Sequence, residues 1–473
     1  MGNFIKVNSD GWTFLRSETG ELFIPFGSNY YDPLAGWPPH LWKTFNLDTT
    51  RKHFELMKDI GVNIVRFHLS YPSFYDQKHK VNAQGVENLV QMLQICKEFE
   101  IVALIAGLVY YEGLPKWDVE DYFVSDEVID NLCFFWRELS SVLKNEEIVF
   151  GYDIYNEPSI PWYSQRIENK WHQYLKNKYQ QISQFSKSLD ISGMVRDFNE
   201  IPIPTFANNI NPALVFEYRM FQERLAFKWV KDQVEAIKSI DGNHLVTVGV
   251  NPWTFPDLRF VDVGYGKCRG FNTHFIAPLL DFVSVHYYPL SFFLGEDYPD
   301  PISTESGLQI ALSLCEGLCR LSFENKPIVL EEFGWYGGGA PGWAGIIDSL
   351  PFKSEIEQAH YCRLLIESSK DWCGGWIQWT YGDTPQSSDI SQFGGLVDKE
   401  GRLKTWGNEF TALAETIQNT KLARKSGTYQ KQIDLFELYS SESKENQFWN
   451  EYLAEKEVNG SIDFQFSDQP SPL

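Results

Sequence analysis

The feature that most constrains the fold is an alternation of short apolar runs with longer amphipathic stretches along most of the 473 residues. Eight of the apolar runs have the length and the β-branched and aromatic content of buried strands. They are Leu22–Tyr30, Val62–His68, Ile101–Tyr110, Ile148–Tyr155, Leu245–Val250, Phe282–His286, Ile328–Glu332 and Gly375–Thr380. Helical periodicity fills the intervals, most clearly at Thr50–Ile60, Val86–Phe99, Val124–Leu143, Phe216–Ile240, Leu308–Phe323 and Ser354–Ser369. Eight strand–helix units predict an α/β fold of the (β/α)8 (TIM) barrel type.

The predicted connections after the strands are long for a plain barrel, and they lie on the face where barrel enzymes carry their active sites. The longest is a helical insertion at about 159–214, in which Ile167, Trp171 and Leu175 keep a helical period. We expect it to form a small cap over that face. The barrel domain is predicted to span residues 1–418, and the polar segment 419–473 is predicted to be an extension that is packed on the outside or partly mobile.

The acidic composition restricts the partners. Asp and Glu number 63 against 41 Lys and Arg, a formal net charge of −22, which repels nucleic acids and anionic membrane surfaces. No apolar run reaches the roughly 20 residues of a membrane helix, and no export signal is visible, so we expect a cytoplasmic protein. The seven cysteines include no C-x-x-C pair, which is typical of free thiols in a reducing compartment.

Two of the predicted strands end in a carboxylate. The fourth runs into the motif Asn-Glu-Pro at 156–158, and the seventh runs into Glu-Glu-Phe-Gly at 331–334. In a closed barrel, Glu157 and Glu332 would therefore face each other across one opening. Glycoside hydrolysis needs such a pair, because one carboxyl protonates the leaving oxygen while the other attacks the anomeric carbon or activates a water.

These motifs at the ends of strands four and seven make the chain similar to glycoside hydrolase family 5 over about residues 10–415. The resemblance implies that Glu157 is the general acid/base and Glu332 the nucleophile. It also implies substrate-binding roles for five residues at strand ends, namely Arg66, Asn156, His286, Tyr288 and Trp379. Asn156 would hold the sugar 2-hydroxyl, and Trp379 would form the floor under the sugar at the cleavage point. Glu331 is expected to point to the opposite face of its strand, because strand neighbours alternate.

The resemblance further implies a double displacement with retention of configuration, without a metal or an organic cofactor. Carboxyl groups of retaining enzymes lie about 5–5.5 Å apart, against about 6.5–9.5 Å in inverting ones. Glu332 has to be ionised to attack, and we expect Arg66 and a hydrogen bond from Tyr288 to lower its pKa. Glu157 has to begin protonated and to become the base once Glu332 has reacted.

Several of these residues also have a structural interpretation. Arg66 could pair with a structural carboxylate, and His286 or His68 could be a satisfied core histidine. Many family members carry a histidine at the end of strand three. Here Tyr111 and Glu112 follow that strand and could take over its polar contacts.

Aromatic residues gather in the predicted loops after the strands, where flat apolar rings could stack on sugars. Trp253, Trp335 and Trp343 stand beside Pro or Gly and are the candidates for substrate-binding platforms, with core packing as an equal alternative. The loop 337–342 spells G-x-G-x-x-G, but Pro341 and the preceding carboxylates argue against a dinucleotide site.

Together these patterns predict a retaining β-glycosidase that hydrolyses β-linked glucans, mannans or derived oligosaccharides, cellulase-like or mannanase-like in character. Two other functions remain open on the same residues. One is a carbohydrate-binding barrel that keeps its aromatic platforms but does not turn over. The other is a transglycosylase, in which a sugar hydroxyl rather than water accepts the glycosyl group.

Overall fold

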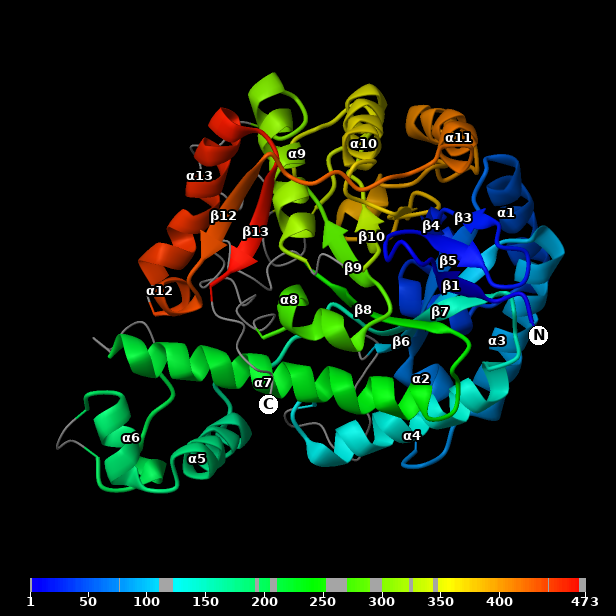
Figure 1. Cartoon of the computed structure of the whole chain (residues 1–473). Coiled ribbons are helices and arrows are strands. Elements are labelled where there is room, and N and C mark those ends of the chain that lie inside the picture. The colour runs from blue at the N-terminus through cyan, green and yellow to red at the C-terminus, as the bar shows by residue number, and fades with distance from the viewer. Residues whose placement is uncertain are drawn as a thin grey trace.

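The structure is a computed structural model that describes residues 2–75, 77–109, 122–191, 195–204, 211–251, 270–289, 300–322, 326–342, 348–440 and 442–467. Eight parallel strands close into a barrel (Figure 1). In chain order they are β4 (Phe26–Asn29), β5 (Ile64–Ser70), β6 (Val102–Val109), β7 (Val149–Asn156), β8 (Leu245–Val250), β9 (Val283–Tyr287), β10 (Ile328–Phe333) and β11 (Gly375–Gln378). Every predicted strand contributes to the barrel, so the predicted (β/α)8 fold is confirmed.

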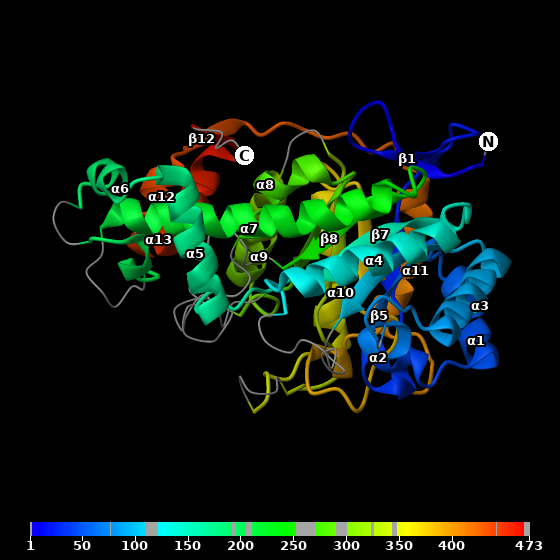
Figure 2. The same cartoon turned by 90° about the horizontal axis from the view of Figure 1, so that it is seen from below.

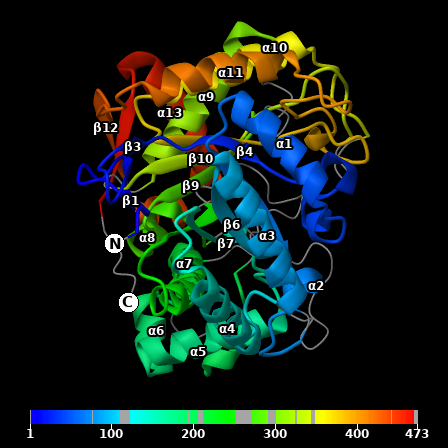
Figure 3. The same ribbon diagram turned by 90° about the vertical axis from the view of Figure 1, so that its right-hand side faces the viewer.

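An outer layer of helices surrounds these strands (Figure 3). It contains α1 (Leu47–Asp59), α3 (Ala83–Phe99), α4 (Asp126–Leu143), α7 (Pro212–Lys238), the short α8 (Thr273–Ile276), α9 (Glu305–Arg320), α10 (Glu355–Ser369) and α11 (Thr405–Gln418), and a one-turn α2 (Tyr71–Phe74) follows β5. Several helices begin earlier than their apolar period suggests, because a capping side chain lies upstream. Asn46 caps α1, and Asn82 caps α3.

A small antiparallel sheet, absent from the sequence-based expectations, lies at the N-terminal end of the barrel. Its strands are β1 (Ile5–Val7), β2 (Phe14–Arg16) and β3 (Leu22–Phe23), so the predicted first strand is divided between this sheet and β4. Phe14 packs edge-on against Phe150 and Phe282, with ring centroids 5.2 and 5.7 Å away. The barrel lumen is therefore closed at this end by an apolar plug.

The lumen becomes polar toward the C-terminal ends of the strands. Its lower layer consists of apolar side chains such as Ile64, Leu245 and Val329. One inward position further along two of these strands stand Arg66 and Glu331, both fully buried. The sequence thus places a buried charged layer directly beneath the face that carries the predicted site.

The insertion after β7 is helical, as predicted. It forms α5 (Gln165–Tyr179), α6 (Ile182–Ser188) and a short 3₁₀ turn, and these helices lie alongside α7 (Figure 2). Lys178 forms an ion pair with Glu217 of α7, and Lys170 forms one with Asp126 of α4. These contacts hold the insertion against the outer helices, and they do not support the expected cap over the strand ends.

The C-terminal segment packs on the outside of the barrel, which was one of its two predicted alternatives. Strands β12 (Tyr429–Ile433) and β13 (Ile462–Phe466) pair in parallel, joined by α12 (Leu435–Tyr439) and α13 (Glu442–Asn459). Trp449 and Tyr452 of α13 press on α9 at Gly317, where an added Cβ would lie under 3 Å from both rings. The division into a barrel domain and an extension at residue 418 stays a prediction.

None of the helices in the described part of the chain is both long and apolar enough to span a membrane. The six cysteines among the described residues are free and buried. A cytoplasmic location stays a prediction.

Candidate active site

The two predicted carboxylates come together at the C-terminal end of the barrel. Glu157 directly follows β7, has a left-handed φ of 50°, and donates its backbone N–H to the Gly249 carbonyl at 2.8 Å. Glu332 is the last residue but one of β10. One carboxyl oxygen of each and a ring nitrogen of His286 all lie within 4.8 Å of one another. The Glu157 side chain is 29% exposed and that of Glu332 is 6% exposed, so Glu157 is the more accessible of the two carboxylates.

His286 links the two carboxylates. Its Nδ1 lies 2.9 Å from Glu157 Oε1 and 3.6 Å from Glu332 Oε2. Burial by itself would lower the pKa of His286, but Glu332, Glu157 and Glu331 raise it to about 10. His286 is therefore an imidazolium at neutral pH, and an imidazolium has no lone pair to offer a metal ion. The spacing of the three groups would suit a metal ion, but binding one would require His286 to release a proton.

Arg66 lies at the centre of the site and is completely buried. One terminal nitrogen donates to Glu332 Oε1 at 2.7 Å and to Asn29 Oδ1 at 2.9 Å. The other donates to Asp153 Oδ2 at 2.6 Å and to Asn156 Oδ1 at 2.7 Å. Arg66 pairs with the structural carboxylate Asp153, one of its two expected interpretations, and it also contacts Glu332. Its substrate-binding role stays a prediction.

The pKa of Glu332 differs from the sequence-based expectation. Tyr288 donates its hydroxyl hydrogen to Glu332 Oε2 at 2.7 Å, as predicted. Burial raises the pKa of Glu332, and the opposing effects of His286, Arg66 and Tyr288 offset only part of that rise. The expectation of a lowered pKa was therefore wrong in direction, because it counted the charged partners but not the loss of water around the carboxylate.

Trp379 borders the same site. Its ring is partly exposed, its Nε1–H donates to Ser391 Oγ at 2.9 Å, and the peptide bond to Thr380 is cis. His68, at the end of β5, is buried with its ring centroid 6.0 Å from that of Trp379. Burial and the charge of Arg66 hold the pKa of His68 well below its ordinary value, so this histidine is neutral. His68 therefore belongs to the wall of the site.

Of the three tryptophans expected to stack on sugars, the structure describes Trp335. Trp335 is only 2% exposed and packs against Tyr336, with ring centroids 5.0 Å apart, so it presents no open face to a sugar. That prediction is corrected to core packing. Trp253 and Trp343 lie outside the described residues, as do Tyr111 and Glu112 after strand three.

Glu331 does not point away from the site, contrary to expectation. It follows Val329 on the inward face of β10, and the register of β10 against β9 shifts between Leu330 and Glu332. Glu331 Oε2 accepts a hydrogen bond from Ser284 of β9, and Oε1 lies 3.4 Å from Arg66 Nε. The irregularity lets two consecutive glutamates contribute to the same site.

Four further residues support the site from beneath and were missed from the sequence. They share a polar side chain on the inward face of a barrel strand: Asn29, Asp153, Ser284 and Glu331. A polar residue inside an otherwise apolar strand was the signal that could have revealed them, since buried polar groups need partners.

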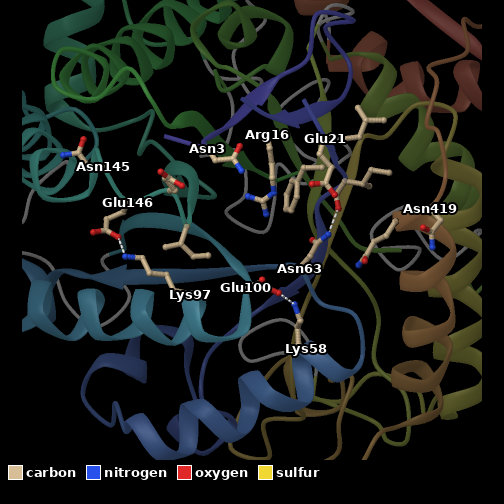
Figure 4. Close-up of a pocket in the computed structure, with 16 residues that line it drawn as sticks. Asn3, Arg16, Glu21, Lys58, Asn63, Lys97, Glu100, Asn145, Glu146 and Asn419 are labelled. Carbon is tan, nitrogen blue, oxygen red and sulfur yellow. Dashed lines mark hydrogen bonds and ion pairs between the residues drawn. The ribbon is translucent and has the colours of Figure 1, made fainter. Parts of the chain in front are cut away.

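A separate cavity lies at the opposite end of the barrel. It has a volume of about 1000 Å³ and is lined by residues that precede strands, such as Asn63 before β5 and Ile148 before β7 (Figure 4). The ion pair between Lys58 and Glu100 crosses it at 3.0 Å. None of its lining residues belongs to the predicted site, and barrel enzymes use the other face.

Comparison with protein families gives two overlapping matches. The profile of the cellulases of glycosyl hydrolase family 5 matches residues 25–214, which contain Asn156 and Glu157. The profile of the glycosyl hydrolase family 42 β-galactosidases matches residues 129–333, which contain both Glu157 and Glu332.

Among curated sequences, mannan endo-1,4-β-mannosidase 3 of Solanum lycopersicum is 28% identical over 115 residues, covering 22% of this chain and 26% of that protein. A putative mannan endo-1,4-β-mannosidase 9 of Oryza sativa subsp. japonica is 25% identical over 108 residues, covering 23% of this chain and 26% of that protein. The matched part thus spans about a quarter of these relatives.

Solved structures share the fold along almost the whole chain. A GH5_18 protein of Streptomyces cattleya in complex with Manβ1-4GlcNAc has a TM-score of 0.65 at 16% identity, covering 94% of both chains. An exo-β-1,4-mannosidase of Opitutaceae bacterium strain TAV5 has a TM-score of 0.63 at 17% identity, covering 98% of this chain and 73% of that one. A β-galactosidase of Halorubrum lacusprofundi has a TM-score of 0.71 at 14% identity, covering 95% and 68%. The two family matches, the mannosidase relatives and the shared fold make the chain similar to the clan of (β/α)8 glycoside hydrolases that includes family 5.

Proposed function

We propose that the protein is a retaining β-glycosidase that hydrolyses β-linked glucans, mannans or derived oligosaccharides by double displacement. The observation that carries the proposal is the approach of a Glu157 oxygen to within 4.8 Å of a Glu332 oxygen. This spacing supports a retaining geometry of about 5–5.5 Å between carboxyl groups, because an inverting pair stands about 6.5–9.5 Å apart to admit a water.

In the first step, Glu332 attacks the anomeric carbon while Glu157 gives its proton to the departing glycosidic oxygen. Arg66 on one oxygen of Glu332 and Tyr288 on the other support this role, because together they fix the plane of the carboxylate before attack. The product of the step is an ester between Glu332 and the sugar, with the leaving alcohol released.

In the second step, Glu157 takes a proton from water, the water oxygen bonds to the anomeric carbon, and the ester bond to Glu332 breaks. Asn156 accepts from Arg66 through Oδ1, so the amino end of its amide is oriented as the donor toward a sugar 2-hydroxyl. Trp379, partly exposed and held by Ser391, would provide the apolar floor beneath the ring.

The substrate class is drawn from the relatives. Both plant sequences are named as mannan mannosidases, and two of the similar structures are an exo-β-1,4-mannosidase and a complex with Manβ1-4GlcNAc. These names favour β-mannosides as the first substrates to test, followed by β-glucosides.

The test is hydrolysis of a panel of aryl β-mannosides, β-glucosides and β-galactosides, with the anomer formed first identified by proton NMR. We expect the β-anomer, and we expect Glu157→Gln to lower kcat/KM by about 10²–10⁴-fold. Glu332→Ala should abolish turnover and, with added azide, should form an α-glycosyl azide. Glu100→Gln, a change to an exposed carboxylate in the cavity at the other end, is the matched control and should have no effect.

Other outcomes would overturn the proposal. An α-anomer formed first would indicate inversion. Sugar binding without hydrolysis by the unmutated protein would indicate a binding barrel. Products in which a second sugar, rather than water, carries the glycosyl group would indicate a transglycosylase.

A further inference from the structure

Resting on the proposed function, we propose that Glu331 is a positioning residue that holds His286 as a doubly protonated cation between the acid/base Glu157 and the nucleophile Glu332. Glu331 touches neither the sugar nor the reacting atoms. It acts through His286, on the side of the imidazole that faces away from the substrate.

Carboxylates lie on both sides of the His286 ring, near each of its two nitrogens. Nδ1 faces Glu157 Oε1 at 2.9 Å and Glu332 Oε2 at 3.6 Å. Nε2 faces Glu331 Oε2 at 3.5 Å. A neutral imidazole donates from one nitrogen only, whereas an imidazolium donates from both and therefore needs an acceptor on each side. Glu331 is the carboxylate that faces Nε2 on the inner side, at ion-pair distance rather than in a hydrogen bond.

The contact between His286 and Glu331 is sealed inside the barrel. Both side chains are completely buried, and strand β8 passes directly over them at Gly249. A Cβ added to Gly249 would lie 2.7 Å from His286 Nε2 and 2.9 Å from Glu331 Oε2. A glycine is thus required for the strand to approach this closely, and the electrostatic attraction between the two groups acts in a water-poor interior.

The charged and titratable groups around His286 come from the adjacent strand β10 and, across the barrel lumen, from β5 and β7. They are Arg66 and His68 on β5, Asp153 and Glu157 on or after β7, and Glu331 and Glu332 on β10, with the phenol of Tyr288 beyond β9 itself. His68 is neutral, so Arg66 and His286 are the cations that balance this group of carboxylates.

The titration of these groups agrees with the geometry. Burial would raise the pKa of Glu331, but Arg66 and His286 hold it below its usual range, so Glu331 is ionised. Asp153 is also fully buried, and burial together with Glu331 raises its pKa to about 7 despite its bond to Arg66. Glu331 is thus the permanent anion on the inner side of His286.

The consequence for the reaction is a fixed positive charge beside both carboxylates. In the resting site it favours the ionised nucleophile, since His286 is among the groups that lower the pKa of Glu332 against the effect of burial. Once Glu332 is consumed in the ester, the same N–H group remains directed at Glu157 while that residue acts as the base.

The test observes His286 directly and needs no substrate. In protein labelled with ¹⁵N-histidine, the two ring-nitrogen shifts of His286, assigned with His286→Gln, report its protonation as pH is raised. We expect His286 to stay doubly protonated through neutral pH in the wild-type protein and to lose its proton at clearly lower pH in Glu331→Gln. Asp383→Asn, which removes a buried carboxylate of another loop, is the control and should leave the His286 titration unchanged.

The proposal is overturned if Glu331→Gln titrates as the wild type does. If that variant does not fold, Glu331→Asp retains the charge but withdraws it from Nε2, and it should give an intermediate titration. A His286 that is neutral at pH 7 in the wild-type protein would also overturn the proposal, whatever the variants do.

Failure of this inference and failure of the proposed function are distinguishable. A protein that hydrolyses no glycoside can still show the expected change in His286 titration, because NMR requires no turnover. Conversely, the protein can be a retaining glycosidase while Glu331→Gln changes neither the His286 titration nor the acid limb of kcat/KM. That result would support the proposed function and refute the positioning role of Glu331.

Discussion

Replacing Tyr288 by Phe removes one hydrogen bond to Glu332 and leaves the shape of the side chain almost unchanged. The hydroxyl donates to Glu332 Oε2 at 2.7 Å, and Tyr288 is 9% exposed, so the bond is short and buried. A hydrogen bond to a charged group contributes about 1.5–3 kcal/mol. One pKa unit corresponds to about 1.4 kcal/mol, so the loss of the bond should raise the pKa of Glu332 by about 1–2 units.

The assay is the pH dependence of kcat/KM on the best aryl glycoside of the panel. The nucleophile reacts in its ionised form, so a higher pKa of Glu332 moves the acid limb of the profile to higher pH by about 1–2 units. Burial and the charge of Glu332 raise the pKa of Tyr288 itself well above its ordinary value. The wild-type profile should therefore have no basic limb from the phenol.

The control is Tyr336→Phe. This hydroxyl also lies in a buried tyrosine and donates to the Pro351 carbonyl at 2.7 Å, but it has no contact with Glu332. Its loss should reduce stability without moving the acid limb. An acid limb that stays in its wild-type place in Tyr288→Phe, with the fold intact, would refute the reasoning, because Arg66 and His286 would then suffice to set the ionisation of the nucleophile.

Three further predictions concern stability. Gly249→Ala inserts a Cβ 2.7 Å from His286 Nε2, so it should lower the free energy of unfolding by about 1–3 kcal/mol in urea; an unchanged value would mean that β8 can move outward. Lys404→Met leaves the carboxylate of Asp383 buried without its partner at 2.9 Å and should lower the free energy of unfolding by about 3–5 kcal/mol. Adding Asp383→Asn should restore part of that loss, as judged from the Tm of the double variant. Burial raises the pKa of Glu223 to about 8. The stability associated with its protonated form is therefore complete below pH 4.5 and is lost as pH rises through 8. Glu223→Gln should gain stability relative to wild type over that interval, and a constant difference between the two proteins would contradict the assignment.

The strand ends are the part of the site that the sequence predicts well. Asn156 and Glu157 follow an apolar run and precede a proline, so their position at the end of a strand can be predicted from adjacent residues in the chain. Tyr288, which directly follows β9, has similarly local surroundings, whereas Arg66 lies within β5 and not at its end. Once eight such runs close into a barrel, all of these ends meet at one opening, and no long-range detail is needed to bring them together.

The layer beneath the strand ends could not be predicted in the same way. Alternation puts Glu331 and Glu332 on opposite faces of an ideal strand, but which one faces inward depends on the register of β10 against β9, and that register is irregular between them. Burial is equally non-local. Trp335 stands beside a glycine in the sequence, yet its ring is buried and packs against Tyr336. The direction of the Glu332 pKa shift also depends on burial, because burial removes the water that would stabilise the carboxylate.

The composition of that layer indicates what it is for. The lumen of a (β/α)8 barrel is ordinarily filled by branched apolar side chains, and the lower layer here follows that pattern. Replacing a buried ion network by apolar residues of similar volume is often neutral or stabilising, whereas removing one member leaves an uncompensated charge. Stability alone therefore does not account for Arg66, Asp153 and Glu331 in place of a second apolar layer. Their contacts with Glu332, Asn156 and His286 do account for them, because each contact helps to fix a side chain of the candidate site. A charged layer thus replaces an apolar one in the barrel lumen, and its contacts hold Glu157 and Glu332 in one arrangement.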